Sequence, residues 1–94
     1  MLRAIDIGNT NITLGLYINE ELGPRWRLAT NHERMPDEFG LQFISMLNHS
    51  GYQPDDLTGI CLASVVPPLT GTFIEACRKY LSLEPLVVDT GVPK

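Results

Sequence analysis

Residues 4–17 read Ala4-Ile5-Asp6-Ile7-Gly8-Asn9-Thr10-Asn11-Ile12-Thr13-Leu14-Gly15-Leu16-Tyr17, two runs of β-forming residues around a short polar segment. Glycine and asparagine adopt positive φ at low cost, so residues 8–11 predict the turn of a β-hairpin. Asp6 lies between two isoleucines in a strand that we expect to be at least half buried, where an unpartnered carboxylate is costly. Two interpretations of Asp6 follow: it caps the turn, or it faces a cation whose phosphate is held by the amides of the turn.

The first third of the chain predicts three antiparallel strands, at about residues 2–7, 12–18 and 22–29. In the third strand Trp26 and Leu28 fall on one face, whereas Arg25 and Arg27 fall on the other. Pro24 near the start of this strand is typical of a sheet edge, because proline cannot donate a hydrogen bond to a neighbouring strand.

The rest of the chain alternates helical and strand patterns. Pro36 and the two acids after it favour a helix start, and the pattern predicts a helix over about residues 36–50. Residues 59–66 form an apolar run that is typical of a strand buried on both faces. Pro67 and Pro68 end this strand and open a second helix over about residues 68–82, and residues 86–88 form a last short strand. The predicted buried stripes are Phe39, Phe43, Ile44 and Leu47 in the first helix, and Leu69, Phe73, Cys77 and Leu81 in the second.

The order β-β-β-α-β-α-β predicts an α/β fold with a mixed five-stranded sheet in the order 3-2-1-4-5. In this order the chain makes two right-handed crossovers, and the fourth strand lies beside the first and parallel to it. The ends of these strands, at residues 8–11 and 64–67, should then meet at the topological switch point, where open α/β sheets bind ligands.

Composition and charge exclude several classes of protein. Of the 94 residues, 44% are hydrophobic and 19% are charged, which is typical of one globular domain rather than a disordered chain. The net charge of −4 offers no basic surface for nucleic acid or an anionic membrane, and no apolar run has membrane-spanning length. Cys61 and Cys77 lack metal-binding spacing, so we expect buried free thiols in a cytoplasmic protein. His32 and His49 are predicted to be solvated rather than to bind a metal.

Two motifs resemble those of a known family. Asp6-Ile7-Gly8-Asn9-Thr10-Asn11 resembles the first phosphate motif of type III pantothenate kinases, which are also named Bvg accessory factor-like. Ala63-Ser64-Val65-Val66-Pro67-Pro68-Leu69-Thr70 resembles a second signature of that family, and Pro85-Leu86-Val87-Val88-Asp89-Thr90-Gly91-Val92 resembles the segment that follows it. The similarity covers essentially the whole chain. It implies that residues 1–94 form a ribonuclease H-like (actin-like ATPase) half-domain of the acetate-and-sugar-kinase/Hsp70/actin superfamily.

The resemblance also implies a function, namely ATP-dependent phosphorylation of pantothenate to 4'-phosphopantothenate in coenzyme A biosynthesis. It implies that Asp6 binds Mg²⁺ and that the terminal phosphates of ATP lie against Gly8, Asn9, Thr10 and Asn11. It further implies a monovalent cation, K⁺ or NH₄⁺, and a homodimer in the full-length protein. No nucleic-acid or membrane partner is expected.

Several parts of the family pattern have no counterpart in this chain. The family's catalytic aspartate, in a Gly-x-Asp-Arg motif, is expected beyond Lys94, as is a second half-domain of the same fold. No residue of this chain therefore takes the catalytic role, and we expect the 94-residue chain to be inactive by itself. Two alternatives stay open: a non-catalytic regulatory or binding module of the same fold, and a structural half-domain that needs a complementary chain.

Overall fold

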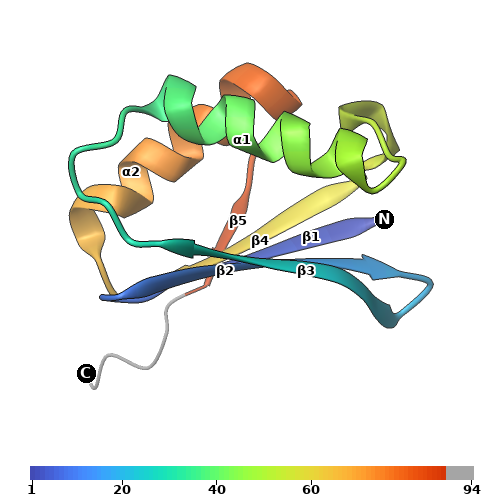
Figure 1. The fold of residues 1–94 in the computed structure, drawn as a ribbon, viewed down its shortest axis with the longest axis horizontal. Helices are drawn as coiled ribbons and strands as arrows, with labels where there is room; N and C mark the ends of the chain where they lie inside the picture. Colours follow the sequence, from blue (N-terminus) through green and yellow to red (C-terminus); the bar gives the residue numbers. More distant parts are fainter. Residues whose placement is uncertain (89–94) are drawn as a thin grey trace.

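The computed structural model describes residues 1–88, which form one sheet with two helices packed against it (Figure 1). The elements are β1 (Leu2–Ile7), β2 (Asn11–Ile18), β3 (Glu21–Ala29), α1 (Pro36–His49), a 3-10 turn (Pro54–Asp56), β4 (Gly59–Ser64), α2 (Pro67–Ala76), a π-helical turn (Cys77–Leu81) and β5 (Leu86–Val88). Neither α1 nor α2 has the length and apolar character that a membrane-crossing helix requires.

The sheet has the predicted strand order, β3-β2-β1-β4-β5. β1 pairs with β2 and β2 with β3 in antiparallel fashion, whereas β1 with β4 and β4 with β5 are parallel. The second hairpin turn is built from Asn19 and Glu20, whose φ angles of 52° and 68° are both left-handed. Such two-residue turns match the right-handed twist of the strands that they connect.

Both helices cover the same face of the sheet (Figure 1). The crossover through α1 and the crossover through α2 run in the same direction across the sheet, and right-handed crossovers in one direction lie on one face. The apolar core fills the space between, and its aromatic centre is Phe73, whose ring centroid lies 4.2 Å from that of Phe39 and 5.6 Å from that of Phe43. All of the predicted stripe residues are buried except Ile44, which is half buried.

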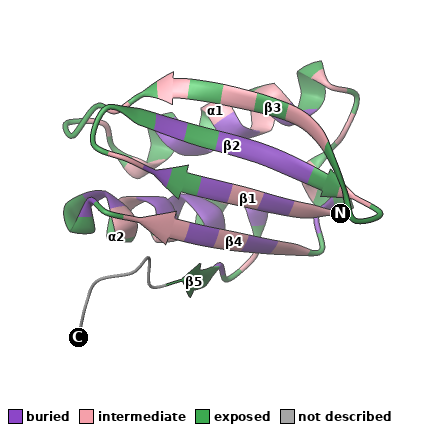
Figure 2. Ribbon diagram, turned by 90° about the horizontal axis from the view of Figure 1, so that it is seen from below, coloured by how far each residue is buried: buried purple, intermediate pink, exposed green. Residues whose placement is uncertain are grey.

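Within residues 1–88 no helix lies on the opposite face of the sheet, and Figure 2 views the molecule from that side. We call it the open face, defined by Ala4, Asp6, Thr13, Gly15, Tyr17, Leu22, Arg25, Arg27, Cys61, Ala63 and Val88. The expectation that β4 is buried on both faces is therefore wrong. Ile60 and Leu62 are buried under the helices, but Cys61 and Ala63 are only half buried. Both cysteines are free, and only Cys77 is fully buried.

The second helix ends earlier than predicted. The α-helix stops at Ala76, and a π-helical turn continues to Leu81, after which Ser82 takes a left-handed φ of 55°. Cys77 and Leu81 remain buried through this turn, so the predicted apolar stripe is preserved although the helix type changes. A surface cluster ties this turn to α1, because Lys79 Nζ and Tyr80 OH both donate to Asp37 Oδ1, at 2.8 and 2.7 Å.

Arg3 is a buried charge that the sequence pattern did not reveal. It lies on the core side of β1 with no exposed surface, and its guanidinium carbon is 5.0 Å from the ring centroid of Phe43 and 5.8 Å from that of Trp26. Its side-chain nitrogens have no hydrogen-bond partner among the described residues. Burial lowers the pKa of Arg3 to about 10, so the side chain stays protonated at neutral pH.

Candidate functional site

The turn between β1 and β2 is closed by a short backbone hydrogen bond. The N–H of Gly8 donates to the carbonyl oxygen of Asn11 over 2.9 Å. A Cβ atom on Gly8 would come within 3.0 Å of that oxygen, so this position favours glycine for lack of space. None of residues 8–11 has positive φ, and our expectation that Gly and Asn were needed here for left-handed backbone is therefore wrong.

Thr30, the residue after β3, holds the turn from one side. Its hydroxyl donates to the carbonyl of Gly8 over 2.8 Å, and its N–H donates to the carbonyl of Thr10 over 3.0 Å. The sequence analysis missed this role. The pairing register of β2 and β3 could have revealed it. Ala29 pairs with Asn11, and Thr30, the next residue of the chain, therefore falls beside the turn.

The other side of the turn faces solvent and offers hydrogen-bond donors. Asn9, Thr10 and Asn11 are exposed, and Asn11 Nδ2 donates to Thr10 Oγ1 over 3.2 Å. Within residues 1–88, no acceptor pairs with the backbone N–H of Asn9 or of Thr10. Because the carbonyls of Gly8 and Thr10 are bonded to Thr30, and the amides of Asn9 and Thr10 have no partner among residues 1–88, the turn presents donors to a ligand. That is the arrangement that binds phosphate oxygens.

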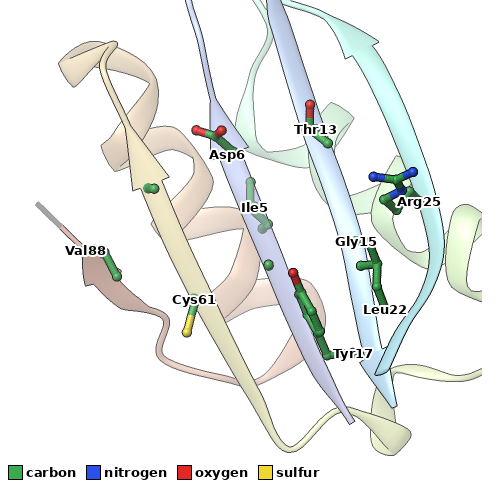
Figure 3. A pocket seen from close by; sticks show the side chains of 11 residues that line it. Ile5, Asp6, Thr13, Gly15, Tyr17, Leu22, Arg25, Cys61 and Val88 are labelled. Atoms are coloured by element: carbon green, nitrogen blue, oxygen red, sulfur yellow. The ribbon is translucent and has the colours of Figure 1, made fainter. Parts of the chain in front are cut away.

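Asp6 is exposed on the open face, although the strand around it is at least half buried, as expected. It lies near the end of β1, between Ala63 of β4 and Thr13 of β2 (Figure 3). The helices lie on the other face of the sheet, and the small Ala63 does not cover the carboxylate. No described residue donates a hydrogen bond to Asp6, so the interpretation of Asp6 as a cap of the turn is wrong.

The end of β4 meets the end of β1, as predicted for the switch point. Ser64 pairs with Ile7, and the N–H of Val65 donates to the carbonyl of Ile7 over 3.0 Å. The two motifs 6–11 and 63–70 are therefore adjacent in space. Helix α2 begins here with Pro67 and Pro68, which have no N–H groups. The helix start can thus contribute its dipole to an anion but few amides, which leaves the turn as the main source of donors.

A hollow of about 400 Å³ on the open face adjoins this site (Figure 3). Asp6 and Thr13 line its upper part, whereas the exposed turn residues 8–11 do not line it. Its floor is made of small or apolar side chains. The hollow and the turn are therefore separate features, and Asp6 lines the hollow two residues before the turn begins.

Among residues 1–88, this site offers a metal one carboxylate, that of Asp6. Nowhere in residues 1–88 do three or more His, Cys, Asp or Glu side chains gather as a metal site of their own. This donor set does not suit zinc, which takes several protein ligands. It fits Mg²⁺, which binds through one or two carboxylates and completes its shell with water and phosphate oxygens.

Comparison with known proteins places this geometry in a family. The family model described as type III pantothenate kinase matches residues 2–93. A type III pantothenate kinase of Thermomicrobium roseum is 47% identical over 97 residues, which cover 99% of this chain and 38% of that protein. A type III pantothenate kinase of Geobacillus kaustophilus is 40% identical over 92 residues, which cover 98% of this chain and 36% of that protein. The type III pantothenate kinase 1 of Symbiobacterium thermophilum is 48% identical over 84 residues, which cover 89% of this chain and 31% of that protein.

This chain thus spans well under half the length of these relatives. The segment Asp89-Thr90-Gly91-Val92, for which we noted a resemblance, lies outside the described residues. The match over residues 2–93 nevertheless includes both of the motifs that meet at the end of β1, and the chain belongs to the type III pantothenate kinase family.

Proposed function

We propose that this chain is the first half-domain of an enzyme that transfers a phosphoryl group from ATP to pantothenate, giving 4'-phosphopantothenate for coenzyme A biosynthesis. The observation that supports it most is the turn at residues 8–11, which follows the exposed Asp6 by two residues and in which the amides of Asn9 and Thr10 have no partner among residues 1–88. Family membership supplies the reaction. No observation on the described residues favours a non-catalytic module instead.

In this proposal the chain binds and orients the terminal phosphates of ATP. The N–H groups of Asn9 and Thr10 donate to phosphate oxygens, and the side chains of Thr10 and Asn11 add further donors. Gly8 lets the turn close tightly, because a Cβ at this position would come within 3.0 Å of the Asn11 carbonyl oxygen. Phosphoryl transfer depends mainly on such positioning and on charge neutralisation.

Asp6 is proposed to hold Mg²⁺, directly or through water. When bound, the metal neutralises phosphate charge. The carboxylate lies two residues before the turn and has no hydrogen-bond or ion-pair partner among residues 1–88, so it is available to a cation at the phosphates.

Other parts of the proposal rest on the resemblance alone. They are a catalytic aspartate and a second half-domain outside this chain, a monovalent cation (K⁺ or NH₄⁺), a homodimer in the full-length protein and a cytoplasmic location.

The test is titration of ATP–Mg²⁺ into the 94-residue chain, followed by calorimetry. We expect Asp6→Asn to weaken binding by about tenfold or more, because an amide is a poor ligand for a hard cation. Its melting temperature should be unchanged or higher, since Asp6 has no protein partner to lose. The control is Asp55→Asn, an equivalent change at another exposed carboxylate. Equal binding by both variants and the unmodified chain would contradict the proposed role of Asp6.

A further inference from the structure

Two arginines of the edge strand β3 lie on the open face without an ion-pair partner. Arg25 and Arg27 are two residues apart in β3, and both are exposed. The chain has 11 acidic residues, yet neither guanidinium forms an ion pair with a side chain of residues 1–88. Residues two apart in a strand point to the same face, with Cα atoms about 7 Å apart. The two positive charges therefore repel each other, and an anion bound between them would relieve that repulsion.

The pairing register sets Arg27 in line with Asp6. Arg27 pairs with Thr13, and Thr13 pairs with Asp6, so the three residues form one row across β3, β2 and β1. All three are exposed, and all three line hollows of the open face. Neighbouring strands are about 4.8 Å apart, which puts the Cα atoms of Arg27 and Asp6 about 10 Å apart. The space above Thr13 therefore suits an anionic group that lies between the guanidinium and a cation on Asp6.

Arg25 lies within reach of the same space. Its stem packs against Gly15, since a Cβ on Gly15 would stand 3.5 Å from Arg25 Cγ. Figure 3 shows its side chain on the open face beside β2, at a level between Gly15 and Thr13. Arg25 and Thr13 line both the hollow of about 400 Å³ and a second hollow of about 350 Å³, which Arg27 also lines. The two hollows therefore meet at Arg25 and Thr13.

The donors in this place are those that bind an oxyanion. Within residues 1–88 the hydroxyl of Thr13 has no hydrogen-bond partner, so it can donate to a ligand. A guanidinium has five N–H donors and no acceptor, and its planar fork matches the oxygens of a phosphate. Two guanidiniums and a hydroxyl favour a phosphate, with its double negative charge, over a single carboxylate.

We propose that Arg25, Arg27 and Thr13 bind a terminal phosphate of ATP on the side away from Asp6. The inference rests on the proposed function, because it takes the phosphates of that reaction as the ligand. The amides of residues 8–11 then donate at the end of the strands, and the guanidiniums neutralise phosphate charge from β3. Charge neutralisation around the transferred group is a main requirement of phosphoryl transfer.

The probe is inorganic tripolyphosphate, titrated by calorimetry into the 94-residue chain without a metal ion. It has the phosphate groups of ATP without the nucleoside, and in the absence of metal its binding does not need Asp6. We expect Arg25→Gln and Arg27→Gln each to weaken this binding by about tenfold or more, because each removes a charge-assisted hydrogen bond. Thr13→Val keeps the shape of the side chain and should weaken binding by about threefold or more.

The matched control is Arg78→Gln, which removes one positive charge from the π-helical turn, away from the open face. Its affinity should stay within about twofold of that of the unmodified chain, because salt screens distant exposed charges. Arg27→Lys keeps the charge but loses the planar fork, so its affinity should lie between those of the unmodified chain and Arg27→Gln. Substitution of Arg25 or Arg27 should not lower the melting temperature, since neither guanidinium has a partner among residues 1–88 to lose.

Four results would overturn the inference. The first is no binding of tripolyphosphate by the unmodified chain, and the second is equal binding by the unmodified chain and Arg27→Gln. The third is an equal loss in Arg78→Gln, which would show attraction by overall charge rather than a site. The fourth is displacement of tripolyphosphate by pantothenate, which would identify a carboxylate as the ligand.

The proposed function fails in a different way. Asp6→Asn should weaken binding of ATP–Mg²⁺, but it should bind metal-free tripolyphosphate at least as tightly as the unmodified chain, because it removes a negative charge. If Asp6→Asn leaves ATP–Mg²⁺ binding unchanged while Arg27→Gln loses tripolyphosphate, the role of Asp6 is contradicted and the phosphate site on β3 stands. The reverse pattern contradicts the site on β3 and leaves the proposed function in place.

Discussion

At the scale of single residues, Arg3 is the charged side chain that is buried in the core. Its guanidinium is fully buried and is stabilised by the faces of Phe43 and Trp26 instead of by hydrogen bonds. Cation–π contacts contribute about 0.5–2 kcal/mol each, which is small against the cost of removing a charge from water. The long apolar stem of Arg3 nevertheless fills core volume.

We expect Arg3→Met to raise the free energy of unfolding by about 1–2 kcal/mol, because it keeps the volume and removes the buried charge. Arg3→Ala should be less stable than Arg3→Met by about 2–4 kcal/mol, since it leaves a cavity. Urea denaturation measures both, with the exposed Arg27→Met as control. A large loss of stability in Arg3→Met would show that the charge itself is needed.

Cys77 makes stability depend on alkaline pH. Burial is the main reason that the pKa of its thiol is raised from 9.0 to about 11. Between these values the unfolded chain has lost this proton and the folded chain has kept it, so stability falls as pH rises from about 9 to 11. Conversion of the pKa difference gives a loss of roughly 3 kcal/mol once the pH exceeds both values.

Cys77→Val should therefore lose less stability than the unmodified chain over this range. The measurement is the urea midpoint at several pH values between 8 and about 11. Cys61→Val is the matched control and should follow the unmodified chain. Parallel curves for all three proteins would contradict the assignment of this pH dependence to Cys77.

At the scale of elements, two glycines have opposite roles. At Gly8 a Cβ would approach a backbone oxygen within 3.0 Å, and the turn cannot yield without losing its closing hydrogen bond. At Gly71, inside α2, a Cβ would meet nothing within 4 Å. The first glycine serves the turn, whereas the second only weakens a helix.

We expect Gly8→Ala to destabilise the chain by about 1–2 kcal/mol and Gly71→Ala to stabilise it by about 0.5–1 kcal/mol. Thermal melts monitored by circular dichroism report both changes. Gly8→Ala should also weaken ATP–Mg²⁺ binding, while Gly71→Ala should not. Similar stability changes at the two positions would mean that the turn has no special need for glycine.

At the scale of the whole molecule, this chain contains the turn at residues 8–11 and Asp6, which are only part of what the proposed reaction needs. The catalytic aspartate and the second half-domain are expected outside it, so the purified 94-residue chain should not phosphorylate pantothenate. A coupled assay for ADP release, with a full-length family member as positive control, measures this. ATP-dependent phosphorylation that disappears in Asp6→Ala would contradict the expectation.

Local patterns in the sequence were enough to determine the elements and their order. The polar segment at residues 8–11 marked the first hairpin, and Pro36 and Pro67 marked the helix starts within one residue. The sheet order that we expected with right-handed crossovers, 3-2-1-4-5, brings the two motifs together. These features depend on periodicity, on turn chemistry and on chirality, and all of these act on residues close in sequence.

Tertiary structure alone decided which surfaces are covered. The apolar run of β4 is compatible with burial on one face or on two, because burial depends on elements from elsewhere in the chain. For the same reason Asp6 is exposed and Arg3 is buried. The alternation along β1 places these two charged residues on opposite faces, but it does not say which face is covered. A strand pattern assigns side chains to two faces, but only packing against other elements makes one face a core and leaves the other open.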